Sequence, residues 1–275
     1  MNSTKKTAVV VISTFVVIIA IMVILIPIEK KNEFYAKWGD LAVLAETDPK
    51  VKYIIENEEL YTERLITLLR IDPEFNLDFV YNYAFHKDDY LTMSYTDEEL
   101  DGRVPALYMD DPRWCYQRIS TDDSFPIREG GCGYVSLTMA YIGLTGKSDQ
   151  DPYTIMQLAA DIGALSMFGE GFANDKIVEA AEILGMHAVE YSFYNENRQK
   201  ETHADAELMK DILDKGHVIL ASMDGEIFGL HYIIIRGYEG DSFYINDSDD
   251  REKTARPWTY EELDAEMRYM WDLYV

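Results

Sequence analysis

The sequence predicts a protein that combines α-helices with antiparallel β-strands, in which helices come first and strands dominate the C-terminal part. Two observations lead to this prediction. After Asp101-Gly102, helical spacing of apolar residues is followed by β-rich runs. Two of these runs are joined by Glu239-Gly240-Asp241, a short connection that suits an antiparallel hairpin. With 275 residues, 48% of them hydrophobic, the chain can bury the core of one or two domains.

The composition is strongly acidic and carries no metal motif. Fifty Asp and Glu residues against 25 Lys and Arg give a formal charge of −25, which repels phosphate backbones. We therefore expect no nucleic-acid partner and interpret the acidic residues as a solvated surface. The sequence has no Cys-x-x-Cys, no His-Glu-x-x-His and no calcium-loop pattern, so we expect no metal and no cofactor.

The N-terminus predicts a membrane anchor. A short basic tail, residues 1–7, precedes the run 8–28, which has no charged residue and is long enough to cross the hydrocarbon core. A cleaved signal peptide would have a shorter apolar region and a small-x-small site, whereas this run ends in Ile-Pro-Ile-Glu. Lysines flank the run on both sides and leave its orientation open. Because a basic tail before an apolar run is the ordinary export signal, we expect a single-pass signal-anchor in the cell membrane with an extracellular body.

Residues 32–100 are predicted to form a helical segment without a catalytic motif. Apolar residues recur three and four positions apart, as in Tyr61, Leu65 and Leu68. Asp48-Pro49 and Asp72-Pro73 look like helix starts, because the aspartate caps free amide groups and proline fits the first helical position.

Residues 103–275 are predicted to form the second domain. Helix signals and β-rich runs alternate there, and glycines 146 and 185 stop two of the helices. A capping box at residues 259–262 begins a final short helix. The expected helices are 132–144, 152–162, 174–184 and 205–215, and the expected strands are 187–193, 217–223, 231–238 and 242–247.

Cys132 is the candidate nucleophile. It follows two glycines and begins the predicted helix 132–144, where the helix dipole and unpaired amide groups favour a thiolate. The flanking glycines leave room for a substrate to approach. Two alternatives remain open, namely that Cys132 is a buried small hydrophobe or that it forms a disulfide with Cys115, the other cysteine.

His231 is the candidate base. A catalytic thiolate needs a histidine to pair with it and to transfer a proton to the leaving group. The chain has five histidines, and His231 begins the apolar run 231–235, which predicts a buried strand with the histidine at its exposed end. The other four lie in the helical segment, in a polar loop or at strand starts: His86, His203, His187 and His217.

Asp247 is the candidate residue that orients His231. Eight residues separate His231 from Glu239 and another eight separate Glu239 from Asp247, so a turn near that midpoint sets the two side chains roughly opposite each other. A carboxylate there fixes the ring tautomer and supports the imidazolium. Strand alternation directs Asn246 to the other face. The alternative is an acidic loop that merely ends a strand.

Three motifs resemble the bacteriocin-processing, double-glycine peptidases and their free-standing relatives within the papain-like cysteine peptidases. Asp111-Pro112-Arg113-Trp114 with Gly131-Cys132-Gly133 is similar to the nucleophile region, residues 231–238 to the histidine strand and residues 244–247 to the aspartate strand. The resemblance covers about residues 105–275. It implies a papain-like α+β fold, with the cysteine helix packed on an antiparallel sheet, and a membrane-anchored hydrolase that cleaves peptide or related amide bonds in a peptide or protein substrate.

The sequence departs from this family at the oxyanion donor. The family usually has a glutamine ahead of the Asp-Pro-Arg-Trp motif, and the matching position here is Met109, which cannot donate a hydrogen bond. Losing one such donor commonly costs about a hundred- to a thousand-fold in rate. Gln117 or the backbone amide of Cys132 could substitute. A second departure, Tyr134-Val135 in place of proline and a small hydroxyl residue, alters packing beside the nucleophile.

Three functions therefore remain open. The first is a cysteine-type protease with a Cys132, His231 and Asp247 triad and a thioester acyl-enzyme. The second is a weakly active or inactive peptide-binding protein on the same scaffold. The third is an amidase or acyltransferase that uses the same acyl-enzyme with a different acceptor.

Overall fold

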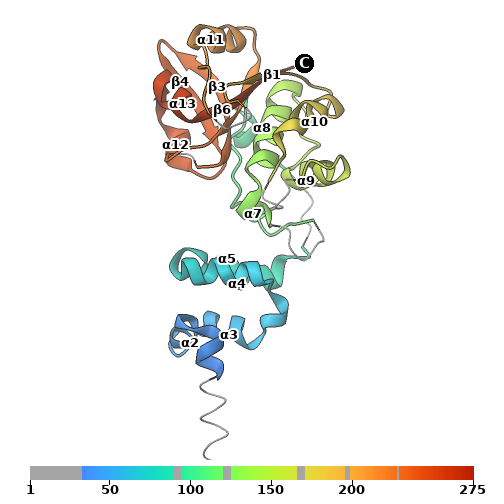
Figure 1. Ribbon diagram of the computed structural model, residues 1–275. Coiled ribbons are helices and arrows are strands. Elements are labelled where there is room, and N and C mark those ends of the chain that lie inside the picture. Colours follow the sequence, from blue (N-terminus) through green and yellow to red (C-terminus); the bar gives the residue numbers. More distant parts are fainter. Residues whose placement is uncertain (1–32, 90–93, 120–124, 166–170, 196–198, 228) are drawn as a thin grey trace, which may run out of the picture. The chain divides into compact units, whose positions relative to one another are not determined.

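The structure is a computed structural model that describes residues 33–89, 94–119, 125–165, 171–195, 199–227 and 229–275. The chain divides into two compact units, Met1–Phe85 and His86–Val275, which are described separately below (Figure 1). The predicted anchor, residues 8–28, lies outside the described residues. Within the described ranges no helix has both the length and the apolar character needed to span a bilayer.

The first unit is helical, as the periodicity predicts. The Asp48 side chain accepts hydrogen bonds from the amides of Lys50 and Val51, and the Asp72 side chain accepts one from Phe75. Both Asp-Pro pairs are therefore helix starts, which confirms the prediction. The helices are α2 (Asp40–Leu44), α3 (Pro49–Glu56), a 3₁₀ turn (Glu58–Leu60), α4 (Glu63–Ile71) and α5 (Pro73–His86).

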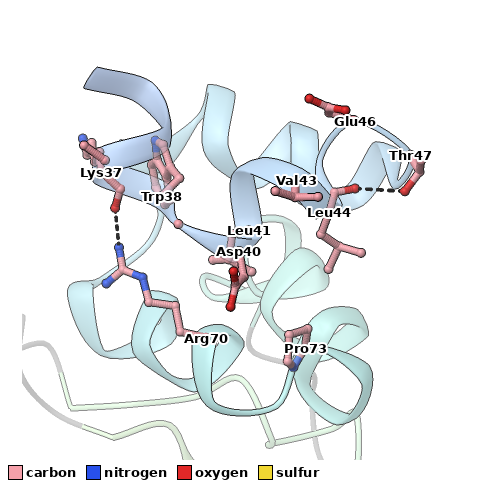
Figure 2. A pocket seen from close by; sticks show the side chains of 12 residues that line it. Lys37, Trp38, Asp40, Leu41, Val43, Leu44, Glu46, Thr47, Arg70 and Pro73 are labelled. Atoms are coloured by element: carbon pink, nitrogen blue, oxygen red, sulfur yellow. Dashed lines mark hydrogen bonds between the residues drawn. The ribbon is translucent and has the colours of Figure 1, made fainter. Parts of the chain in front are cut away.

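A pocket of about 850 Å³ lies in this unit between α2 and the α4–α5 junction. Figure 2 shows Arg70 reaching the backbone carbonyl of Lys37, at 3.3 Å. Both cations lie near the buried ring of Trp38, 5.2 Å from its centroid for Lys37 Nζ and 5.8 Å for Arg70 Cζ. The residues that line this pocket include no cysteine, serine or histidine.

The second unit is built on a six-stranded, wholly antiparallel sheet, which confirms an α+β fold. The strand order is β1-β6-β2-β3-β4-β5. The four strands expected from the sequence are present within one residue of their predicted ends. The strands are β1 (His187–Ser192), β2 (Val218–Met223), β3 (His231–Glu239), β4 (Ser242–Asp247), β5 (Pro257–Thr259) and β6 (Met267–Tyr274).

Helices cover both faces of this sheet, as Figure 1 shows. On one face α8, α9 and α10 share a buried core with side chains of β2, β3 and β6. On the other face α11 and α13 close a second core. The helices of this unit are α6 (Asp97–Leu100), α7 (Ile127–Gly130), α8 (Cys132–Thr145), α9 (Pro152–Asp161), α10 (Ile177–Ile183, after a 3₁₀ turn at Asn174–Lys176), α11 (Ala206–Asp214), α12 (Arg251–Ala255) and α13 (Tyr260–Glu266).

Helix α8 is buried along most of its length, and two glycines allow this. A Cβ on Gly133 would lie 2.6 Å from Cβ of Phe172, and one on Gly143 would lie 2.9 Å from the carbonyl oxygen of Arg103. Only glycine permits such close approach on both flanks. The helix ends at Gly146, whose φ of +66° is the left-handed conformation that ends helices. The predicted helix 132–144 is therefore confirmed, one residue longer.

Candidate active site

Cys132 is the first residue of α8 and is 9% exposed. The turn before it tolerates only glycine, because a Cβ on Gly131 would lie 2.3 Å from the carbonyl oxygen of Ile127. The sulfur therefore lies at a helix N-terminus, where amide groups without intrahelical partners meet the positive end of the helix dipole. Cys115 and Cys132 are both free thiols, so the disulfide alternative does not describe this structure.

His231 is the first residue of β3 and is 7% exposed. Its Nε2 lies 2.7 Å from Oδ1 of Asp247. The side chain of Cys132 acts on the same ring and contributes to raising the pKa of His231. Because Nε2 is taken by the carboxylate, Nδ1 is the ring nitrogen left for the sulfur. The structure thus brings the three predicted residues together in a chain from sulfur to imidazole to carboxylate.

The pairing of Asp247 differs in one detail from the sequence prediction. Asp247 pairs with Ile233 and not with His231, because the turn lies at Gly240 and Asp241, with Glu239 opposite Ser242, and is not centred on Glu239. Residues two apart on a strand share a face, so the carboxylate still reaches the imidazole. Asn246 points elsewhere, as expected from alternation: its Nδ2 donates to the carbonyl of Pro105 at 2.9 Å.

The electrostatics favour an ion pair between His231 and Asp247. Burial alone would lower the pKa of His231, but the hydrogen bonds with Asp247 and Cys132 raise it to about 10. Burial acts on Asp247 in the opposite direction, yet the hydrogen bond with His231 holds the pKa of this carboxyl below its usual range. At neutral pH the pair is therefore an imidazolium beside a carboxylate.

Aromatic residues pack directly beside the first turn of α8, which carries Cys132. The Tyr232 ring comes within 3.3 Å of where a Cβ on Gly133 would lie. The Tyr232 hydroxyl donates to the carbonyl of Phe172 at 3.0 Å and contacts the side chain of Asn174. These contacts fix the loop before α10 against the first turn of α8. These aromatic contacts were not predicted, because nothing in the local sequence ahead of α10 indicates a contact with Tyr232 on β3.

The two residues considered for the oxyanion make other contacts in the structure. Met109 is 6% exposed, and its backbone amide donates to the carbonyl of Ser248 at 2.8 Å. The Gln117 side chain donates to the carbonyl of Asp89 at 2.6 Å. The backbone amide of Cys132, at the open end of α8, is the donor that the local geometry offers.

The Asp-Pro-Arg-Trp motif has a structural role. The Arg113 guanidinium lies 2.6 Å from Oδ2 of Asp111 and also contacts the Glu99 carboxylate. Trp114 is 1% exposed, and its ring nitrogen donates to the carbonyl of Tyr108 at 2.7 Å. The motif therefore fixes helix α6 within the second unit, His86–Val275.

No group of three or more His, Cys, Asp and Glu side chains in the described part of the chain is arranged to hold a metal ion.

Comparisons with known proteins place this unit in a family. Residues 114–274 match the Peptidase C39 like family. No curated protein matches the chain. Similar solved structures include the peptidase domain of Streptococcus ComA, a bi-functional ABC transporter (18% identity, 53% of this chain and 91% of that one, TM-score 0.39). Others are a putative C39-like peptidase from Bacillus anthracis (13% identity, 62% and 94%, TM-score 0.34) and the peptidase C39 like domain of a toxin secretion ATP-binding protein from Vibrio parahaemolyticus (11% identity, 52% and 95%, TM-score 0.31). Because the matched residues make up more than half of its length, this chain belongs to the Peptidase C39 like family.

Proposed function

We propose that the protein is a cysteine peptidase that hydrolyses peptide or related amide bonds through Cys132, His231 and Asp247. The observation that carries the proposal is the buried His231 side chain, which is hydrogen-bonded to Asp247 at 2.7 Å and whose pKa is raised in part by Cys132 at the N-terminus of α8. Membership of the Peptidase C39 like family supports the same reaction. The N-terminal run 8–28 would anchor the enzyme in the cell membrane, with the peptidase unit outside the cell.

The reaction follows from the roles that the three side chains can take. The Cys132 sulfur attacks the substrate carbonyl carbon, and the carbonyl oxygen becomes an oxyanion next to the Cys132 backbone amide. His231 gives the proton on Nδ1 to the leaving amine, the C–N bond breaks and a thioester remains. A water molecule then attacks the thioester, His231 takes its proton, and the acid product leaves. Asp247 keeps a proton on Nε2 throughout.

Alkylation of Cys132 tests this proposal without a known substrate. The full chain in detergent is treated with iodoacetamide at pH 6 and pH 8, and labelled peptides are counted by mass spectrometry. We expect rapid labelling of Cys132 at both pH values, at least tenfold slower labelling in His231→Ala, and an unchanged rate in Cys115→Ala. Burial raises the pKa of Cys115 to about 12, so this thiol serves as an internal slow control. Labelling of Cys132 that does not depend on His231 would count against an ion-paired nucleophile.

A peptide-binding protein with little activity is the second candidate, and Met109 is the observation that favours it. Its thioether cannot donate to an oxyanion, and the Gln117 amide already donates one of its two hydrogens to the carbonyl of Asp89. If the Met109 position faces the oxyanion, Met109→Gln should raise the rate of peptide hydrolysis by about 10- to 100-fold, somewhat less than a native donor is worth.

The matched control for this substitution is Met109→Leu, which keeps a buried apolar side chain without a donor. The three proteins are incubated with a mixed peptide library, and products are quantified by mass spectrometry. Equal rates for the Gln and Leu variants would mean that position 109 does not face the oxyanion. No turnover in any variant, with Cys132 unreactive, would favour the binding protein.

A further inference from the structure

The two oxygens of Asp247 lie in different surroundings. Oδ1 accepts hydrogen bonds from Nε2 of His231 (2.7 Å) and from the backbone amides of Asp249 (2.9 Å) and Asp250 (3.2 Å). Oδ2 is buried and has no hydrogen-bond donor within the described residues, and the side chain as a whole is 0% exposed. A carboxylate oxygen in that state needs a compensating charge, because burial disfavours its ionised form.

Lys253 supplies that charge. Its Nζ lies 3.8 Å from Oδ2 of Asp247 and 3.8 Å from Oδ2 of Asp250, and its side chain is 24% exposed. At this distance the ammonium acts as a charge and not as a hydrogen-bond donor. Within the described part of the chain, the charged groups around Asp247 are His231 on β3, Lys253 on α12, and the carboxylates of Asp249 and Asp250 between them.

The position of Lys253 is fixed by main-chain contacts to the same aspartate. The Thr254 hydroxyl accepts from the Asp247 amide at 2.9 Å and donates to the Asp247 carbonyl at 3.2 Å. The Asp250 side chain caps α12 by accepting from the Lys253 amide at 3.0 Å. The Lys253 carbonyl accepts from the ring nitrogen of Trp258 at 2.9 Å. The helix therefore holds the ammonium beside Asp247 through contacts that do not depend on the lysine side chain.

We propose that Lys253 is a positioning residue that keeps Asp247 ionised while His231 changes its charge during turnover. This inference rests on the proposed function. When His231 gives its Nδ1 proton to the leaving group, the imidazole becomes neutral and the main counter-charge of Asp247 disappears. The ammonium of Lys253 remains charged through this step. Asp247 thus stays a carboxylate that accepts the hydrogen bond from the Nε2–H group, and the ring keeps the tautomer in which Nδ1 can take a proton from water.

The experiment measures the acid titration of Asp247 in the full chain, in detergent. Carbon-13 resonances of the five histidines are followed from pH 6 to pH 2.5, and His231 is identified by its absence in His231→Ala. The low-pH midpoint of the His231 resonance reports protonation of Asp247. We expect Lys253→Met and Lys253→Gln to raise this midpoint by about one pH unit, because a cation within about 4–6 Å of a carboxylate lowers its pKa by that order. Lys253→Arg should restore it.

Lys210→Met is the control, because Lys210 lies on α11 and pairs with Asp241 at 3.2 Å, outside the group of charges around Asp247. This variant should leave the midpoint unchanged. An unchanged midpoint in folded Lys253→Met and Lys253→Gln, judged by circular dichroism, would overturn the role of Lys253. Since the titration needs no turnover, a chain that proves inactive would refute the proposed peptidase and still leave this test decisive.

Discussion

Replacing Asp247 by alanine is expected to cost the protein about 3–5 kcal/mol of stability and to slow alkylation of Cys132 by about a thousand-fold. The stability loss follows from burial, since the side chain is 0% exposed and its Oδ1 accepts three hydrogen bonds. Without the carboxylate, the His231 cation and two backbone amides lose their acceptor in a buried place. The loss of reactivity follows because an imidazole without its carboxylate loses the orientation and the stabilised charge with which it pairs with the thiol.

The substitution Asp247→Asn removes the carboxylate charge and keeps nearly the same side-chain shape. Its amide oxygen can replace Oδ1 toward His231 and the two backbone amides, whereas its amide nitrogen would face the Lys253 ammonium. We expect a smaller loss of stability than in Asp247→Ala, on the order of 1–3 kcal/mol. Alkylation of Cys132 should still be slowed by a large part of the factor expected for Asp247→Ala. Urea unfolding and iodoacetamide labelling of the same samples measure the two effects. Equal labelling rates for Asp247→Asn and the unmodified protein would show that the carboxylate charge is not needed.

The parts of the fold that could be predicted are those with local signals. Helix α9 has a proline at its start and a capping box from Asp151, and α13 has a capping box from Thr259. The β3–β4 hairpin has a short turn with Gly240 at φ +60°. These signals lie within a few residues of the structure they specify, so they can be recognised without knowing the rest of the fold.

Strand β6 could not be predicted, although it lies between β1 and β2 in the sheet. Its buried residues include Met267, Met270 and Trp271, a spacing of three and four that is typical of a helix. It also follows directly on α13, so the helical pattern of the sequence continues into it without a break. The strand forms because it pairs with β1 on one side and with β2 on the other. Its partners lie 44 to 87 positions earlier in the chain, so the local sequence does not indicate this pairing.

Of the candidate site, the pair of His231 and Asp247 could be predicted, because counting residues outward from the hairpin turn brings these two side chains together. Counting from a turn at Glu239 placed Asp247 near His231 correctly, but the turn lies at Gly240 and Asp241, so Asp247 pairs with Ile233 instead of His231. Lys253 was missed because α12 has only five residues and follows an acidic run that looks like a loop. Its role depends on which oxygen of Asp247 lacks a donor, a fact that only the three-dimensional arrangement contains.

His231 is expected to remain protonated throughout the neutral range, because its hydrogen bonds with Asp247 and Cys132 outweigh burial and raise its pKa to about 10. The folded pKa exceeds the unfolded value of about 6.5, so protonation of His231 stabilises the folded state. This contribution is fully present below pH 6.5 and is lost as the pH rises through about 10. Asp247 affects stability in the acidic range. Its pKa is lowered in the folded state, so its contribution to stability is lost only as the pH falls below the usual range of a carboxyl.

The free energy of unfolding by urea, compared between the unmodified protein and His231→Gln, measures this dependence. The difference should be largest near pH 6 and should shrink toward pH 10, by at most about 1.4 kcal/mol per pH unit. The carbon-13 resonance of His231 should show no titration between pH 6 and pH 8, and Asp247→Asn should bring its midpoint down toward the ordinary histidine value. A His231 midpoint near 6.5 in the unmodified protein would mean that the buried pair is neutral, and the thiol would then lack the cation on which the proposed chemistry depends.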